Sequence, residues 1–203
     1  MDIRKKLWVF GDSFFVPFWD SPFPLSESYI RWKGGIPKVY GERVSEELDL
    51  KMEHRARGGW DNYSIFQSVC DSVDSISEGD VVIIGWTGTI RFRLWEGGRW
   101  FSHNPQTVSS PLHKGILTNR FESEKGCSEE VESWMKLIRK ALPNNPTIFW
   151  CTNPKSLIPA ETIWGVETIG EETDGFIEDG HPSEGGHKVL ADRFIRLLRN
   201  RWI

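Results

Sequence analysis

A serine follows directly on the first apolar run of the sequence. Residues 7–15 read LWVFGDSFF, so the run ends in Gly11-Asp12-Ser13 and then turns aromatic again. These three residue types are common in turns, and the tripeptide alone indicates a turn after a strand. The alternative is chemical, because a serine hydroxyl becomes a nucleophile when a nearby imidazole removes its proton as the bond forms. Other segments of the chain decide whether Ser13 belongs to a plain turn or to a catalytic site.

Three further segments stand at the ends of predicted strands or just before the last predicted helix. ARGGWDNYSI follows the second predicted strand and includes Gly58-Gly59, IIGWTG ends the third and includes Thr87, and IEDGHPSEGGH, with His181, precedes the last predicted helix. With the first segment, and in this order, they resemble the four blocks of the SGNH hydrolase superfamily, also called GDSL esterases. Those blocks carry Ser, Gly, Asn and His. The resemblance spans residues 7–195, and its first and last blocks are the most specific.

The resemblance implies a serine esterase that acts through a covalent acyl-enzyme, with no metal and no organic cofactor. It makes Ser13 the nucleophile and His181 the general base. Family members typically carry an aspartate three residues before the histidine, but here position 178 is Glu and Asp179 lies two residues before. Either Glu178 reaches the imidazole, or the turn is tighter and Asp179 serves. A short side chain followed by Gly180 bends back with little loss of rotamer freedom, which slightly favours Asp179.

The second requirement of this chemistry is a set of hydrogen-bond donors fixed before charge develops on the substrate oxygen. The resemblance gives this role to the backbone N–H groups of Ser13 and Gly59. The third donor of the family is an asparagine, and Thr87 stands in its place in Gly85-Trp86-Thr87-Gly88. A hydroxyl also donates, and the loss of one such donor typically costs about a hundred- to a thousandfold in rate. Thr87 is therefore expected to be a weaker third donor.

Residues just downstream of the second and third blocks are candidates for contacts with the substrate. Asn62 and Arg91 could offer an amide and a guanidinium to the same pocket, with a structural or solvated role as the equal alternative. Some phage-associated SGNH-like sequences look similar here, with Thr or Ser in place of Asn and an Arg shortly after. Trp60 and Trp86 join these candidates. His187, on the first turn of the last helix, is expected to be structural.

Predicted strands alternate with predicted helices along the chain. This order predicts a three-layer α/β/α sandwich with a central, mostly parallel sheet of about five strands, the flavodoxin-like architecture of SGNH hydrolases. The expected strands are residues 7–10, 52–56, 80–85 and 147–151, and the expected helices are 38–48, one capped by Asp61, one capped by Ser128 and ended by Pro143, and about 183–202. The chain of 203 residues is expected to form a single domain.

Three segments do not fit the alternation: residues 14–36, 91–126 and 152–177. Each follows a predicted strand, so each should emerge at the carboxyl edge of the sheet, where open α/β folds bind their ligands. Segments of this length in a compact domain are usually lids or binding loops. We therefore expect them to be long loops around the site.

The aromatic residues favour particular substrates. The chain has 11 tryptophans, and those in the segments expected around the site are Trp19, Trp32, Trp60, Trp86, Trp95, Trp100 and Trp164. Indole faces stack on the C–H faces of sugar rings, which favours an O-acetylated carbohydrate, although any one of them could instead fill the core. One alternative is a glycan-binding protein of a phage or surface assembly that has lost turnover. Another is a lysophospholipase or thioesterase with an acyl channel of phenylalanines: Phe14, Phe15, Phe18 and Phe23.

Composition argues against several other classes of protein. The 25 basic and 29 acidic residues are scattered, so no concentrated positive field indicates a nucleic-acid partner. Cys70, Cys127 and Cys151 are widely spaced, odd in number and form no C-x-x-C pair, which argues against both a disulfide framework and a zinc site. No apolar run reaches the roughly 18 residues of a membrane span. The run after Arg4-Lys5-Lys6 is broken too early for a signal peptide, so we expect a soluble protein, with compartment and oligomeric state left open.

Overall fold

A parallel β-sheet forms the centre of the molecule. The computed structural model describes residues 4–13, 16–17, 38–88, 91–103, 110–122, 124–151, 163–164 and 182–202. In this part of the chain the central sheet has five parallel strands in the order β2-β1-β3-β6-β7. Their bounds are β1 Lys6–Phe10, β2 Lys51–His54, β3 Val81–Trp86, β6 Thr147–Cys151 and β7 Ile163–Trp164. The predicted sheet is confirmed.

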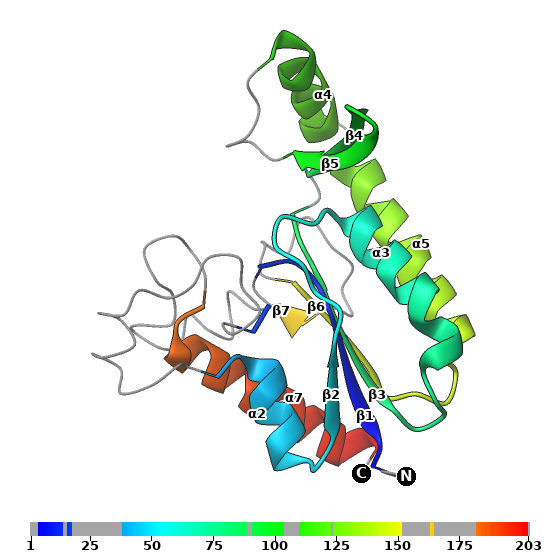
Figure 1. Ribbon diagram of the computed structural model, residues 1–203, viewed down its shortest axis with the longest axis vertical. Helices are drawn as coiled ribbons and strands as arrows, with labels where there is room; N and C mark the ends of the chain where they lie inside the picture. The colour runs from blue at the N-terminus through cyan, green and yellow to red at the C-terminus, as the bar shows by residue number, and fades with distance from the viewer. Residues whose placement is uncertain are drawn as a thin grey trace.

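Helices cover both faces of the sheet (Figure 1). Helices α2 (Tyr40–Glu47) and α7 (Glu184–Arg201) pack on one face, and α3 (Asn62–Ser72) and α5 (Glu124–Ala141) on the other. Successive side chains of a strand point to opposite faces, so Leu7 and Val9 pack under α2 and α7 while Trp8 and Phe10 pack under α3 and α5. A short 3₁₀ helix, η2 (Val73–Ser75), follows α3. The three-layer α/β/α prediction is confirmed.

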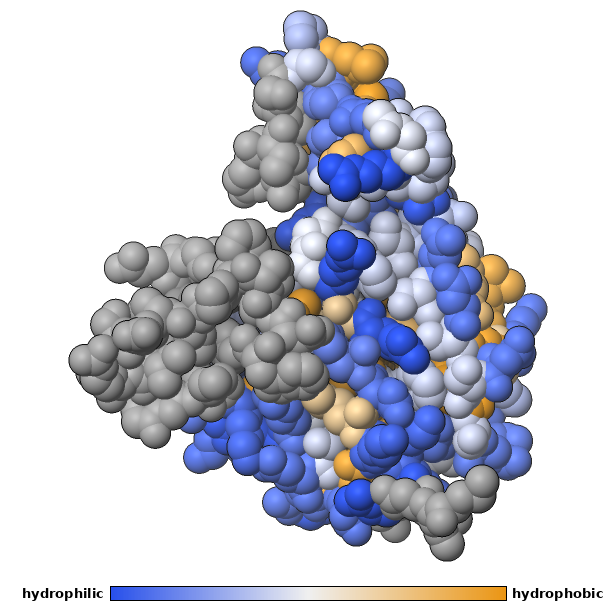
Figure 2. All heavy atoms as spheres, viewed as in Figure 1, coloured by the Kyte–Doolittle hydropathy of each residue, from blue (hydrophilic) through white to orange (hydrophobic). Residues whose placement is uncertain are grey.

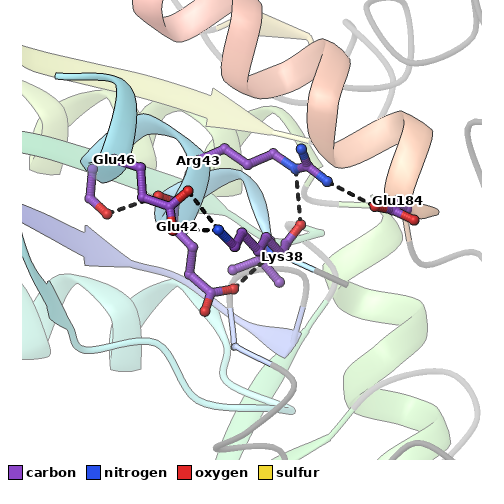
Figure 3. Close-up of polar contacts among 7 residues, drawn as sticks. Lys38, Glu42, Arg43, Glu46 and Glu184 are labelled. Atoms are coloured by element: carbon purple, nitrogen blue, oxygen red, sulfur yellow. Dashed lines mark hydrogen bonds and ion pairs between the residues drawn. The ribbon is translucent and has the colours of Figure 1, made fainter. Parts of the chain in front are cut away.

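Polar contacts join α2 to the start of α7 (Figure 3). The Arg43 Nη2 atom lies 3.1 Å from Glu184 Oε1, and Arg43 Nε donates to the Lys38 carbonyl at 3.2 Å. The helix begins at Tyr40, later than predicted, and the Glu42 carboxylate accepts a hydrogen bond from the Val39 N–H at 2.9 Å. The surface over these two helices is mostly hydrophilic (Figure 2). The ion pair therefore fixes the start of α7 against α2 at a solvated boundary, where such pairs add little stability.

The helix caps agree with the sequence in one case and disagree in another. Asp61 caps α3 as predicted, since its Oδ1 accepts a hydrogen bond from the Ser64 N–H at 2.7 Å. The prediction that Ser128 caps α5 is wrong, because α5 begins at Glu124. Cys127, buried on the same side as Val131, extends the apolar stripe of the helix by one turn toward its N-terminus.

Residues 91–126, expected to be a long loop, contain regular structure. Strands β4 (Phe92–Glu96) and β5 (Arg99–His103) form an antiparallel hairpin, and α4 (Pro111–Glu122) follows and leads into α5. The turn uses Gly97 and Gly98, whose φ angles of +55° and +84° suit a two-residue hairpin turn. We call β4, β5 and α4 the hairpin–helix unit. It lies beyond the carboxyl edge of the sheet, at the top of Figure 1.

The other two expected loops, residues 14–36 and 152–177, lie mostly outside the described residues. Strand β7 falls inside the second of them and was not predicted. None of the described helices combines the length and apolar character needed to cross a bilayer.

Candidate active site

Ser13 lies just beyond the carboxyl end of β1, beside the second sequence block. The pairing of β1 with β2 continues past both strands, because the Arg55 N–H donates to the Val9 carbonyl at 2.8 Å and the Arg57 N–H to the Gly11 carbonyl at 3.1 Å. This pairing brings Gly58 alongside Ser13. A Cβ atom at Gly58 would lie 3.8 Å from the Ser13 Cβ. The first two blocks therefore meet at the edge of the sheet.

The backbone at Gly59 has a conformation that favours glycine. Its φ angle is +81°, in the left-handed region, where an L side chain is strained. A Cβ atom at this position would have no described atom within 4 Å. Among the described residues, nothing fills the space beside the Cα of Gly59.

Thr87, at the end of β3, is held by the side chain of Asn62. The Asn62 Nδ2 donates to the Thr87 carbonyl at 3.0 Å, and the Thr87 N–H donates to Asn62 Oδ1 at 2.8 Å. Both residues are buried. These two hydrogen bonds are the structural role that the sequence left as the equal alternative for Asn62, and a contact of its amide with a substrate stays a prediction. Asn62 acts as a positioning residue for the third block.

Arg91 joins the first block to the second. Its Nη1 atom lies 3.4 Å from Asp12 Oδ2 and donates to the Trp60 carbonyl at 3.1 Å. Asp12 directly precedes Ser13 and is 1% exposed, so this cation offsets a carboxylate that has almost no contact with solvent. The sequence analysis assigns no role to Asp12, although its position directly before the candidate nucleophile Ser13 could have indicated one.

Trp86 belongs to the core, which corrects its prediction as a substrate contact. It is 1% exposed, and its ring stacks on Phe149 with centroids 6.3 Å apart and packs against Trp134. The cause is the position of β3, a central strand covered by helices on both faces. Trp95 and Trp100 differ. They are 60% and 55% exposed and meet edge to face across the β4–β5 hairpin, with centroids 5.3 Å apart.

A groove of about 680 Å³ connects the glycine turn with the hairpin–helix unit. Residues from both parts line it, among them Gly58, Gly59, Trp60, Arg93, Trp100 and Phe101. The Arg93 guanidinium carbon lies 3.7 Å from the centroid of the Tyr63 ring and 4.6 Å from that of Trp100. This cation–π stack fixes one wall of the groove. Sequence reasoning missed Arg93, because it expected a loop where an alternating strand forms.

The histidines fall into different surroundings. His187 is buried on the first turn of α7, and its ring packs near Tyr40 with centroids 6.1 Å apart, which agrees with a structural role. Tyr40, the neighbour of His187, is itself fully buried, and this burial raises the pKa of its hydroxyl well above the ordinary value. The predicted base His181 and the two acids Asp179 and Glu178 lie outside the described residues.

Known proteins resemble this chain in structure but not detectably in sequence. No protein-family model and no curated protein matches the chain. Among solved structures, the chain is similar to the acetyl xylan esterase Est2A from the rumen bacterium Butyrivibrio proteoclasticus, with a TM-score of 0.54 and 14% identity over 97% of this chain and 64% of that one. It is also similar to a carbohydrate esterase whose active site has catalytic and non-catalytic binding functions, with a TM-score of 0.50 and 15% identity over 98% and 69% of the two chains.

A third similar structure is the lipase Lip_vut3 from a goat rumen metagenome. Its TM-score is 0.50 and its identity 15%, over 95% of this chain and 96% of the lipase. The chain thus spans 64% of the length of the acetyl xylan esterase and nearly the whole lipase. These likenesses concern the fold. The chain has the three-layer α/β/α fold of the SGNH hydrolases.

Proposed function

We propose that this chain is a serine esterase that removes a short O-acyl group, such as acetyl, from a carbohydrate through an acyl-enzyme. One observation carries the proposal: Ser13, the Gly58-Gly59 turn and Thr87 follow the three adjacent strands β1, β2 and β3, and the first two lie in contact range. Three of the four sequence blocks therefore share one edge of the sheet, where open α/β folds bind ligands.

Ser13 is the proposed nucleophile. As its Oγ attacks the ester carbonyl, His181 takes the hydroxyl proton and then gives it to the departing alcohol, and water later releases the acid by the same route. Asp179 or Glu178 holds the imidazole in the required tautomer. The start of α7 supports this arrangement, because the Arg43–Glu184 pair and the cap of Ser183, which accepts from the Gly186 N–H at 3.1 Å, fix the chain soon after His181.

The proposed oxyanion donors are the N–H groups of Ser13 and Gly59 and the hydroxyl of Thr87. Buried polar contacts support their preorganisation: Arg91 steadies the residues next to Ser13 and Gly59, and Asn62 holds the backbone of Thr87. Donors fixed before reaction need no reorganisation when charge develops, which is usually the largest catalytic contribution.

The groove supports a carbohydrate ester as the substrate. It runs from the Gly58-Gly59 turn to the exposed ring of Trp100, beside the Arg93 guanidinium. Ser13 is not one of the described residues that line it but lies beside Gly58, which does, so the sugar of an ester held at Ser13 would extend past Gly58 toward this aromatic wall. Two of the similar structures are an acetyl xylan esterase and a carbohydrate esterase. The lipase supports the alternative of a long-chain ester, which the same experiment tests.

The test is an ester panel with fluorophosphonate labelling, run on wild type, Ser13→Ala and the control Ser68→Ala, whose serine lines the groove. We expect labelling and hydrolysis of an aryl acetate and an acetylated xylo-oligosaccharide to fall at least about a thousandfold in Ser13→Ala and to persist in the control. Wild-type rates in Ser13→Ala would refute the assignment. Faster cleavage of long-chain esters would identify a lipase, and glycan binding without turnover a binding protein.

A further inference from the structure

Three side chains of the hairpin–helix unit bring nitrogen and oxygen ligands together. The Glu96 Oε1 lies 2.9 Å from His113 Nε2 and 3.6 Å from His103 Nε2. One ligand atom from each residue lies within 4.8 Å of the other two. Two ligands of a tetrahedral zinc ion, each about 2.0–2.1 Å from the metal, are about 3.3 Å apart. The separations at Glu96 bracket this value, so a small movement of side chains would admit an ion.

The His103 side chain is buried and that of His113 is mostly buried, and three of their four ring nitrogens have no hydrogen-bond partner among the described residues. The side chains of His103 and His113 are 10% and 13% exposed. Within the described residues, neither ring nitrogen of His103 has a hydrogen-bond partner, and Nδ1 of His113 has none. Such nitrogens are costly to bury, because each gives up its bonds to water. A bound cation would use the lone pair of each Nε2.

An aromatic residue fixes the two rings. Phe92 stacks on His103 with ring centroids 5.4 Å apart and meets His113 edge-on at 6.5 Å. The N-terminus of α4 adds a further restraint, because the Ser110 Oγ accepts a hydrogen bond from the His113 N–H at 3.1 Å. The ring of Phe92 thus forms an apolar wall beside both imidazoles, and an apolar surround of this kind limits the access of solvent to a metal site.

We propose that Glu96, His103 and His113 bind a zinc ion that joins β4, β5 and α4. Two imidazoles and one carboxylate suit zinc, while magnesium and calcium prefer oxygen ligands alone. Three protein ligands leave one coordination position for water or a substrate group, and Glu96, which is 39% exposed, lies on the solvent side. The ion stabilises the unit that carries Trp100, and its binding does not depend on the esterase activity.

The sequence gives little sign of this site. The expectation of no metal came from the family resemblance and from the spacing of the cysteines, and the three ligands at positions 96, 103 and 113 match no common zinc spacing. They converge because the hairpin returns β5 alongside β4 and α4 packs against both ligand-bearing strands.

The experiment titrates the metal-free full-length chain with ZnCl₂ against a chromophoric chelator. We expect one equivalent of zinc per chain, at least a hundredfold weaker binding in His103→Ala and His113→Ala, and unchanged binding in His54→Asn, whose histidine lies on β2 outside the cluster. Magnesium should not compete. Co²⁺ in place of zinc should give the intense visible bands of a low-coordinate site, weakened in the same variants.

Glu96→Gln tests the site even if the alanine variants fail to fold. It keeps the shape of the side chain and one hydrogen-bond acceptor and removes only the charge. It should fold as wild type by circular dichroism, bind zinc at least tenfold more weakly and lose the rise in melting temperature that zinc gives the wild type. In crystals soaked with zinc, the anomalous peak should lie between the three residues. Equal affinity in wild type and the cluster variants, or a peak elsewhere, overturns the proposal.

Discussion

The carboxyl edge of the sheet and the hairpin–helix unit beyond it are stabilised by different kinds of contact. At the sheet edge, backbone pairing and buried polar contacts fix the chain, as in the paired hydrogen bonds between Asn62 and Thr87. In the unit, long side chains on the surface make the contacts, as in Arg93 over the rings of Tyr63 and Trp100. We expect the first arrangement to tolerate less displacement than the second, because paired buried hydrogen bonds constrain geometry more tightly than the stacking of exposed side chains.

The difference matches what each region would do in the proposed reaction. Oxyanion donors must be held to within a fraction of an ångström, while an aromatic wall recognises its ligand through area and tolerates small shifts. The regions meet at Asp61, whose Oδ1 caps α3 and whose Oδ2 accepts a hydrogen bond from Ser102 of β5 at 3.0 Å. Substitutions on the two sides of Asp61 should therefore have different effects.

Removing the cation at the sheet edge should have the largest effect. Arg91→Met leaves the buried Asp12 carboxylate without its cation and frees the Trp60 carbonyl. We expect a loss of about 3 kcal/mol in the free energy of unfolding, measured by urea titration, and at least a hundredfold loss of kcat on an aryl acetate. Arg93→Met, two residues along β4, is the control and should lose less than about 1 kcal/mol. Equal losses in both would contradict the comparison.

Asn62→Ala should come next, because it removes both hydrogen bonds that hold the buried peptide groups of Thr87. The expected loss is about 2 kcal/mol of stability together with a lower kcat. Thr87→Val separates the two effects, since it keeps the backbone held and removes the hydroxyl. It should lower kcat about a hundredfold with little change in KM. A Thr87→Val enzyme with the wild-type kcat would remove Thr87 from the oxyanion donors.

Asp61→Ala tests the junction between the regions. It removes the cap of α3 and the bond to Ser102, and should cost about 1–2 kcal/mol. Amide hydrogen exchange should speed up in the first turn of α3 and in β5, with β1 and β3 unchanged. Ser102→Ala isolates the second contact and should cost no more than about 1 kcal/mol. Protection of β5 that is unaffected by either variant would show that the unit is held by other contacts.

Trp100→Ala should have the smallest effect on stability, less than about 0.5 kcal/mol, since more than half of its surface is already exposed at 55%. Its effect should be confined to recognition, with KM for an acetylated oligosaccharide raised several-fold and the rate on a small aryl acetate unchanged. Trp202→Ala, at 44% exposure near the end of α7, provides the matched control. A loss on both substrates in Trp100→Ala would place this residue in the reaction itself.

The sheet was predictable because its signals are local and redundant. Buried parallel strands are continuous apolar runs such as VVIIGW of β3, and the Asp61 cap stands next to its helix. The hairpin–helix unit was missed because its strands are short and carry charges, as in Phe92–Glu96, although Gly97-Gly98 and Ser110-Pro111 mark the turn and the helix start.

The candidate site was predictable to a lesser degree. The blocks predict roles for Ser13, Gly59 and Thr87, and these roles stay predictions. The partners of Asn62 and Arg91 depend on contacts between distant segments. Asn62 and Thr87 are 25 positions apart, and a single chain gives no local signal that the amide binds that backbone. The role of Trp86 was wrongly predicted for a similar reason, because its position within a block does not show that helices bury the side chains of β3.

The hairpin–helix unit leaves the sheet just after Thr87 and returns through α5, so it is a single excursion of the chain between β3 and β6. An excursion of this kind can be lengthened, trimmed or exchanged by one genetic event without altering the order of the sheet strands. Grafting a different excursion beyond Arg91, so that the contacts of Arg91 with Asp12 and Trp60 are kept, would thus be a direct route to new substrate preferences in the proposed enzyme.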